Sequence, residues 1–177
     1  MQATSSAPRI LIVEPHKGGL AVMARRLGAA GYRVIACDRA TEAVTELHRS
    51  RPELILAEVR MAPMSGIELT RLVRDDNALA DLPVILINGR SDSEGSCEAL
   101  AAGADDIVTK PFDFDLLLAR IGRALARARA MRELRQDNAA LDARVIERAI
   151  QLGEARAALQ ASEAQRALLA ARSRMPD

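Results

Sequence analysis

Short apolar runs and amphipathic segments alternate along the first two thirds of the chain. The uninterrupted apolar runs are residues 9–13, 33–37, 54–59, 83–87 and 106–109. Runs of this length are typical of strands buried on both faces of a sheet. The apolar positions that mark the helical segments are Leu20, Met23, Ala24 and Leu27; Ala43, Val44 and Leu47; Ile67, Leu69, Leu72 and Val73; Cys97, Leu100 and Ala101; and Leu116, Leu117, Ile121 and Leu125. Five strands alternating with five helices predict an α/β fold with an all-parallel, doubly wound, five-stranded sheet.

The residues that directly follow the apolar runs are the candidates for function. In doubly wound sheets, ligands bind beyond the carboxyl ends of the strands, near the point where the strand order reverses. The residues at these positions are Glu14, Pro15, His16, Glu58, Asn88, Gly89, Lys110 and Pro111. Lys110 is one of only two lysines in a chain with 25 basic residues. A compact ammonium suits a small acidic pocket better than a planar guanidinium does.

A helical pattern continues without a break after the fifth predicted helix. Beyond residue 122 the chain has one glycine, Gly153, and no proline before Pro176. A seven-residue repeat defines a seam formed by Met131, Leu134, Asn138, Leu141, Val145, Leu152 and Leu159. Asparagine at a core position of such a repeat favours a parallel two-stranded register. We therefore predict a parallel coiled-coil homodimer. Because Arg148 and Ser162 also fall on the seam, a monomeric, frayed helix remains the alternative.

These patterns divide the chain into four segments. Residues 1–8 are predicted to be a flexible N-terminus, and residues 9–122 a globular domain. Residues 123–172 are predicted to form the coiled-coil helix, which continues from the fifth helix of the domain, and residues 173–177 a flexible end. A helix of about 60 residues is roughly 90 Å long, so a domain of this size cannot bury its whole apolar stripe.

Composition excludes several classes of protein. The three aromatic residues are Tyr32, Phe112 and Phe114, too few for a surface that stacks single-stranded nucleic acid. A net charge of +1 makes nucleic acid an unlikely partner. No stretch is long and apolar enough to predict a membrane span, and no signal-peptide core is present. The cysteines Cys37 and Cys97 lack metal-ligand spacing, so we expect reduced thiols and a cytoplasmic protein.

Four sequence blocks in residues 9–122 resemble the receiver domain of response regulators, the bacterial proteins of two-component systems. The blocks are "RILIVE", "RPELILAEVRMAPMSGIEL", "LPVILING" and "AAGADDIVTKPFD". The resemblance implies a flavodoxin-like fold and a role in phosphorelay signal transduction. In this family a histidine kinase phosphorylates an aspartate at the end of the third strand, and an acidic pair after the first strand helps to hold Mg²⁺. A Thr or Ser after the fourth strand and a Lys after the fifth contact the phosphoryl group, and an aromatic residue on the fifth strand reports the change.

This chain departs from the family pattern at most of those positions. Mapped onto the pattern, the phosphoacceptor pocket is Glu14 and Pro15 at the acidic pair, Glu58 at the acceptor, Asn88 at the hydroxyl position and Lys110 at the lysine, with Ile107 at the switch position. Only the lysine is intact. The resemblance therefore implies a degenerate receiver, or pseudo-receiver, that is not an enzyme. We expect no cofactor and no bound metal, with Mg²⁺ binding weak or absent because Pro15 offers no side-chain oxygen.

Several alternatives remain open at this point. Glu58 is either a mimic of the phosphorylated acceptor, paired with Lys110 and hydrogen-bonded to Asn88, or a tolerated remnant of a lost site. A phosphorylation-competent receiver is the alternative function. A nucleotide-binding enzyme would need a glycine-rich loop that residues 14–19 do not match. The long helix resembles linkers that join receivers to output domains, so a signalling or output-domain partner is expected. Either the chain is a fragment or the helix is itself the output.

Overall fold

The computed structural model describes residues 7–89 and 92–172, with side chains described up to residue 167. The chain divides into two compact units, Met1–Ala130 and Met131–Asp177, and each is considered by itself. Most of the predicted flexible N-terminus (residues 1–6) and all of the predicted flexible end (residues 173–177) lie outside the described residues.

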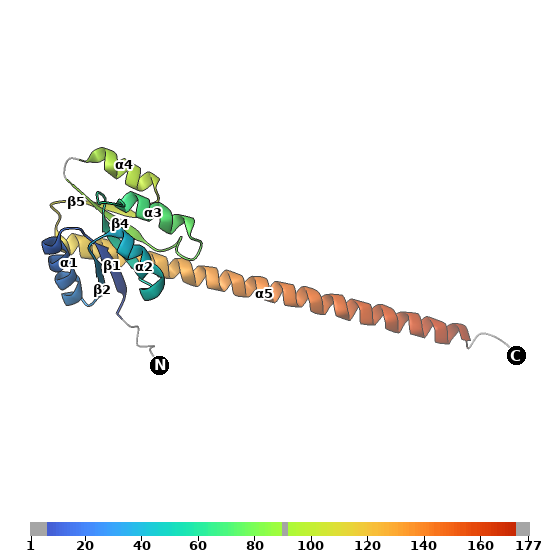
Figure 1. The fold of residues 1–177 in the computed structure, drawn as a ribbon. Coiled ribbons are helices and arrows are strands. Elements are labelled where there is room, and N and C mark those ends of the chain that lie inside the picture. Colours follow the sequence, from blue (N-terminus) through green and yellow to red (C-terminus); the bar gives the residue numbers. More distant parts are fainter. Residues whose placement is uncertain (1–6, 90–91, 173–177) are drawn as a thin grey trace. The chain divides into compact units, whose positions relative to one another are not determined.

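The first unit is built on a five-stranded parallel sheet, as the sequence predicts (Figure 1). The strands are β1 (Arg9–Val13), β2 (Arg33–Cys37), β3 (Leu54–Glu58), β4 (Val84–Asn88) and β5 (Asp106–Thr109). Their spatial order is β2-β1-β3-β4-β5, so the order reverses between β1 and β3. The doubly wound, flavodoxin-like fold is therefore confirmed.

The fourth strand lies one residue later than predicted. Pro83 precedes β4 because proline has no N–H to donate to the ladder, although its carbonyl accepts a bond from the N–H of Ile55 at 2.9 Å. At the other end the strand includes Asn88, whose carbonyl accepts a bond from the N–H of Lys110 at 2.8 Å. This pairing carries Asn88 into the sheet and places Lys110 beside the end of β4.

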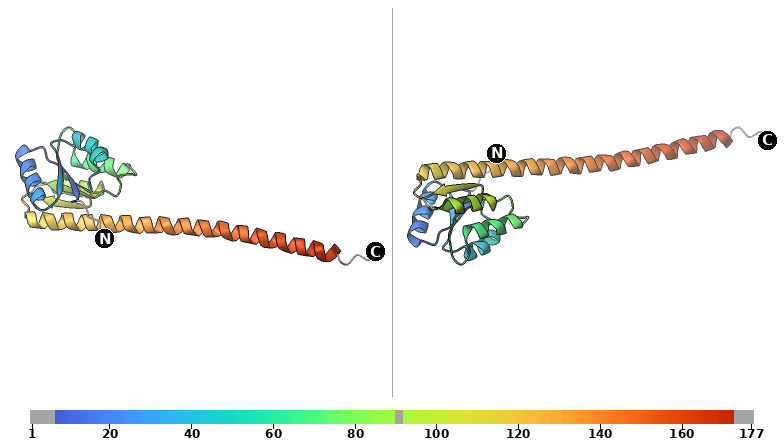
Figure 2. Two further views of the ribbon diagram at one scale, coloured as in Figure 1. Left: turned by 90° about the horizontal axis from the view of Figure 1, so that it is seen from below. Right: turned by 90° about the horizontal axis from the view of Figure 1, so that it is seen from above.

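Helices cover both faces of the sheet (Figure 2). Helix α1 (Lys17–Ala29) and the beginning of α5 (Phe114–Arg172) pack on one face. Helices α2 (Ala40–Ser50), α3 (Gly66–Asp75) and α4 (Ser93–Ala101) pack on the other. Successive strand residues point to opposite faces, and every residue of Ile10–Val13 is fully buried. This burial on both faces of the sheet explains why the strands are continuous apolar runs in the sequence.

Two apolar positions that mark helical segments in the sequence lie outside the core. Leu116 is 54% exposed and Leu100 is 56% exposed. At 100° per residue, the buried stripe of α5 instead follows Phe114, Leu117, Ile121 and Leu125. In α4 the small residues Gly95 and Ala99 are the buried ones. The predicted inward residues Leu117, Ile121 and Leu125 of α5 are thus confirmed, and Leu116 is the exception.

The second unit consists of the continuation of α5. All of its side chains that the structure describes, residues 131–167, are exposed. The exposed fractions of the large apolar seam residues are 42% for Met131, 56% for Leu134, 54% for Leu141, 67% for Val145, 53% for Leu152 and 59% for Leu159. Within the described part of the chain, no helix has the length and apolar character needed to cross a membrane.

Candidate functional site

The predicted site residues meet at the carboxyl edge of the sheet. Glu14 follows β1, Glu58 ends β3, Asn88 ends β4 and Lys110 follows β5. Because the strands are parallel, these ends share one edge on either side of the β1/β3 switch point. The topology thus brings together residues that lie as far as 96 positions apart in the chain.

Lys110 joins two glutamates at this edge. Its Nζ donates one hydrogen bond to Oε2 of Glu14 at 2.8 Å and another to Oε2 of Glu58 at 2.5 Å. The side chains of Glu14 and Glu58 are only 5% and 15% exposed, whereas that of Lys110 is 40% exposed. The other carboxylate oxygen of Glu14 accepts a bond from the N–H of His16 at 3.0 Å. We call Glu14, Glu58 and Lys110 the ionic triad.

The ionic triad has a defined electrostatic character. Burial raises the pKa of Glu58, and the neighbouring charge of Glu14 raises it further, while the hydrogen bond and charge of Lys110 oppose the rise. Burial by itself lowers the pKa of Lys110, but hydrogen bonds to the two carboxylates outweigh it and raise the pKa overall. Lys110 therefore stays charged at neutral pH, and Glu58 takes up a proton more readily than an ordinary glutamate does.

A pocket of about 450 Å³ opens above the ionic triad. Its lining residues are Glu14, Pro15, His16, Gly19, Glu58, Arg60 and Lys110. Pro15 and His16 are exposed at its rim. Gly19 makes room for Glu14, because a Cβ at this position would lie 3.3 Å from Cδ of that glutamate. The pocket is thus accessible to solvent, while both of its carboxylates are already bound to the ammonium.

Asn88 is turned away from Glu58. Its side-chain amide donates to the carbonyl of Asp92 at 2.5 Å and to Oγ of Ser96 at 2.9 Å. Its side-chain oxygen accepts a bond from the N–H of Gly89 at 2.8 Å. The predicted hydrogen bond between Asn88 and Glu58 is therefore not among the contacts of the described residues. The amide is used instead to hold the N-terminus of α4.

An ion pair that the sequence did not suggest borders the site. The guanidinium of Arg60, just after β3, binds both carboxylate oxygens of Asp92, at 2.5 and 2.8 Å. Asp92 is the N-cap of α4 and also accepts a bond from the N–H of Gly95 at 2.9 Å. The bond to Arg60, followed by the bond from Gly95, lowers the pKa of Asp92. Since the partners are 32 residues apart, only the cap could have been recognised from sequence.

The switch position on β5 has no aromatic ring. Ile107 is partly buried and packs against the core that α2, α3 and α4 cover. Its neighbour in the strand, Asp106, binds Arg120 of α5 through both carboxylate oxygens at 2.7 Å. A branched aliphatic side chain has few rotamers and no polar group. Ile107 therefore offers a packing contact where the family pattern has a reporting aromatic.

The donor set fits Mg²⁺ poorly. The cation prefers several oxygen ligands in octahedral geometry, but Glu14 and Glu58 already bind Lys110 through one oxygen each. Pro15 contributes no side-chain oxygen. Within the described residues, no group of three or more His, Cys, Asp or Glu side chains is placed to hold a metal ion.

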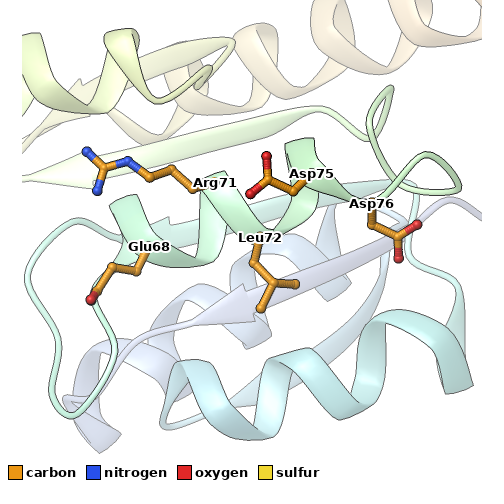
Figure 3. Close-up of a pocket in the computed structure, with 5 residues that line it drawn as sticks. All are labelled: Glu68, Arg71, Leu72, Asp75 and Asp76. Atoms are coloured by element: carbon orange, nitrogen blue, oxygen red, sulfur yellow. The ribbon is translucent and has the colours of Figure 1, made fainter.

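Two further hollows lie on the first unit. One, of about 610 Å³, adjoins the ionic triad and is mainly apolar; Arg26 lies over the ring of Phe114 there, 4.1 Å from its centroid. The other, of about 550 Å³, runs along α3 (Figure 3) and is lined by Glu68, Arg71, Leu72, Asp75 and Asp76. None of the predicted site residues lines the hollow along α3, so the candidate chemistry stays at the sheet edge.

Known proteins provide an independent comparison. The sequence profile of the response regulator receiver domain matches residues 10–122, more than half of the chain. The phosphate regulon transcriptional regulatory protein PhoB of Rhizobium meliloti is 34% identical over 122 residues, covering 69% of this chain and 54% of that protein. The transcriptional regulatory protein KdpE of Mycobacterium tuberculosis is 31% identical over 140 residues, covering 79% of this chain and 61% of that protein. The chain thus spans little more than half the length of these regulators.

Solved structures show the same likeness. The receiver domain of a signal transduction histidine kinase from Syntrophus aciditrophicus is 34% identical with a TM-score of 0.64, covering 68% of this chain and 91% of that one. A response regulator receiver protein from Pseudomonas putida is 28% identical with a TM-score of 0.63, covering 68% of this chain and 99% of that one. The likeness covers the sheet and its helices, and little of the long C-terminal helix.

Proposed function

Because the chain belongs to the response regulator receiver family, we propose that it is a signalling module whose receiver domain works without phosphorylation. The observation that carries the proposal is the ionic triad. Lys110 binds Glu58 at 2.5 Å and Glu14 at 2.8 Å, so the cation that would meet a phosphoryl group in an ordinary receiver already has two carboxylate partners.

The geometry disfavours phosphoryl transfer to Glu58 for three reasons. An attacking carboxylate needs a metal ion and a free cation to offset repulsion from the incoming phosphate. Here the cation is engaged, and the donor set at Glu14 and Pro15 supports at most weak Mg²⁺ binding. Glu58 is also one methylene longer than aspartate, and a misplacement of about 1 Å can cost roughly a hundredfold in rate. We therefore assign this pseudo-receiver no cofactor and no enzymatic role.

The ionic triad also indicates which state the domain adopts. Glu58 makes the contact to Lys110 that a phosphorylated acceptor would make, which supports the mimicry hypothesis. Asn88, however, holds Asp92 and Ser96 rather than Glu58, and Ile107 has no ring to reorient. We infer that the domain keeps a single conformation, in which the contact between Lys110 and Glu58 is permanent. The hydrogen bonds from Asn88 to the N-terminus of α4 are separate from this contact.

The long helix supports a dimeric module. Its exposed seam from Met131 to Leu159 cannot be buried within one helix, so a second copy in parallel register is the proposed partner. A homodimer of this kind would pass the arrangement of two receivers along the helices to an output domain or signalling partner. We place this partnership in the cytoplasm, where receiver domains act, and expect no role for nucleic acid or membrane.

Intact-mass measurement tests the absence of phosphorylation. The whole chain is incubated with a small phosphodonor and Mg²⁺, beside a receiver that has an intact acceptor aspartate as a reagent control. We expect the control to gain one phosphoryl group and this chain to gain none. A phosphoryl group located on Glu58 would refute the proposal and favour the phosphorylation-competent alternative.

Light scattering of the full chain tests the homodimer. A matched variant, Val145→Lys/Leu152→Lys, places two repelling ammonium groups on the seam while keeping good helix formers. We expect association of the native chain and loss of the seam contact in the variant. A native chain with the mass of a single copy, 19.1 kDa, would disprove the dimer.

A further inference from the structure

The second unit carries an apolar surface that the seam does not use. Six residues of α5 follow one another at spacings of four and three, which places them on one face of the helix. They are Ala139, Ala143, Ile146, Ile150, Gly153 and Ala157. Ile146 is 62% exposed and Ile150 is 58% exposed. We call these six residues the second facet.

The second facet lies on a different side of α5 from the seam. At about 100° per residue, its midline is about 130° around the helix from that of the seam residues. A two-stranded coiled coil formed through the seam would therefore leave Ile146 and Ile150 in water. Apolar side chains of this size in a contiguous row indicate a contact surface rather than a solvated face.

The order of residues in the second facet is symmetric. Ile146 and Ile150 lie at equal distances before and after Arg148 along the helix. The pairs Ala143 with Gly153 and Ala139 with Ala157 are centred on the same residue. A two-fold interface brings residue i of one copy against residue j of the other and the reverse, so this order pairs side chains of similar size. Two antiparallel copies aligned at that level bring each Ile146 beside the partner's Ile150.

The sizes of the side chains suit this alignment. The four outer positions are alanine or glycine, so the two backbones can approach closely on either side of the central isoleucines. The contact would extend for about 27 Å along the helix, from residue 139 to residue 157. It lies wholly within the second unit, Met131–Asp177.

Charges at the edges of the second facet are compatible with the same alignment. In an antiparallel pair, Asp142 lies beside the partner's Arg156, and symmetry repeats this attraction at the other end. Glu147 lies beside the Glu147 of the second copy, near the two-fold axis. Both carboxylates are exposed there, so salt screens their repulsion. Two attractive contacts thus outnumber one repulsive contact.

We propose that the second facet is an antiparallel contact with a second copy of this chain. It goes beyond the proposed parallel dimer and rests on it in one respect: the two second facets of such a dimer point to opposite sides, so this contact joins one dimer to the next.

Sedimentation of the full chain tests the assembly. The chain mass is 19.1 kDa, and we expect the native protein to sediment as species heavier than two chains. The variant Ile146→Gln/Ile150→Gln keeps helix propensity, because glutamine favours helices at least as much as isoleucine does. We expect it to sediment with the mass of two chains. An unchanged mass in this variant would overturn the proposal.

Disulfide trapping tests the orientation. In a Cys97→Ser background, Glu147→Cys places two thiols together only in the antiparallel pair, since a disulfide needs Cα atoms within about 7 Å. Glu154→Cys is the matched control, one heptad further on, where the two copies would lie about 18 Å apart along the axis. We expect covalent dimers from Glu147→Cys alone, and equal trapping or none in the two variants would overturn the contact.

A third variant separates this proposal from the parallel dimer. Leu152→Cys in the same background lies on the seam and is trapped only if the seam pairs in parallel. Failure of Leu152→Cys with success of Glu147→Cys would reject the parallel dimer and retain the antiparallel contact. Success of Leu152→Cys with failure of Glu147→Cys would reject the antiparallel contact and retain the parallel dimer.

Discussion

Removing the ammonium from the ionic triad should cost stability in a pH-dependent way. Lys110→Met keeps an apolar stem of similar length but leaves Glu14 and Glu58 side by side with no cation. Removing one partner of a fully buried ion pair costs about 3–5 kcal/mol, whereas exposed pairs are worth about 0–1 kcal/mol. Because the Lys110 side chain is 40% exposed while its partners are 5% and 15% exposed, we expect a loss of about 2 kcal/mol at pH 7.5.

The loss should shrink on acidification. At pH 7.5 the native Lys110 makes its full contribution to the free energy of unfolding. Because its pKa is raised in the folded state, this contribution is complete below the pKa of an unfolded lysine and is lost only as pH rises through the folded pKa. In the variant, two adjacent carboxylates take up one proton more readily as pH falls. The difference from the native protein should therefore fall below about 1 kcal/mol at pH 5.

Tyrosine fluorescence during urea unfolding is the assay. Tyr32 is the single tyrosine, the chain has no tryptophan, and Tyr32 is partly buried and packs against the core of the first unit. The signal thus reports this unit and not the long helix. Lys17→Met, which changes the only other lysine at an exposed position, is the control and should change stability by less than about 0.5 kcal/mol.

A double variant completes the test. Lys110→Met/Glu58→Gln removes one of the two unpaired charges, so we expect it to regain more than half of the stability that Lys110→Met loses at pH 7.5. A loss of the same size at pH 7.5 and pH 5, or a double variant no more stable than Lys110→Met, would refute the electrostatic account of the ionic triad.

The remaining predictions concern the same unit. Gly66→Ala should lower the free energy of unfolding by about 1–3 kcal/mol, because a Cβ there would lie 2.3 Å from the carbonyl oxygen of Glu58; a urea midpoint equal to the native one would contradict this. Asn88→Ala should cost about 1–3 kcal/mol by leaving polar groups at the N-terminus of α4 without a partner, measured in the same way. Glu58→Gln should flatten the pH dependence of stability: a raised pKa means that the folded state loses stability as pH rises from the unfolded to the folded pKa, and an unchanged slope would argue against it. With a disulfide reagent at pH 8, exposed Cys97 should react quickly and Cys37 slowly, because burial raises the pKa of the Cys37 thiol to about 12; two fast equivalents would be the contrary result.

Local pattern was enough to predict the sheet. Each strand is a short apolar run because both of its faces are covered, and this burial leaves a signal in neighbouring residues that needs no knowledge of the fold. The same pattern placed Glu14, Glu58, Asn88 and Lys110 at strand ends, and parallel topology then implied that they share one edge. The inward face of a helix was harder to predict where apolar residues occur on several of its sides, as the exposed Leu116 shows.

Only the tertiary structure decided which of these groups bind one another. The partners of Lys110 lie 96 and 52 residues away, and Arg60 finds Asp92 across 32 residues. Asn88 could have bound either Glu58 or the N-terminus of α4, and in the structure it binds the latter. Hydrogen bonds and ion pairs depend on distances of a few tenths of an ångström, which the packing of the whole sheet sets. Hydrophobic periodicity, in contrast, depends only on which side of a local element faces away from water, so the sequence by itself already determined the architecture.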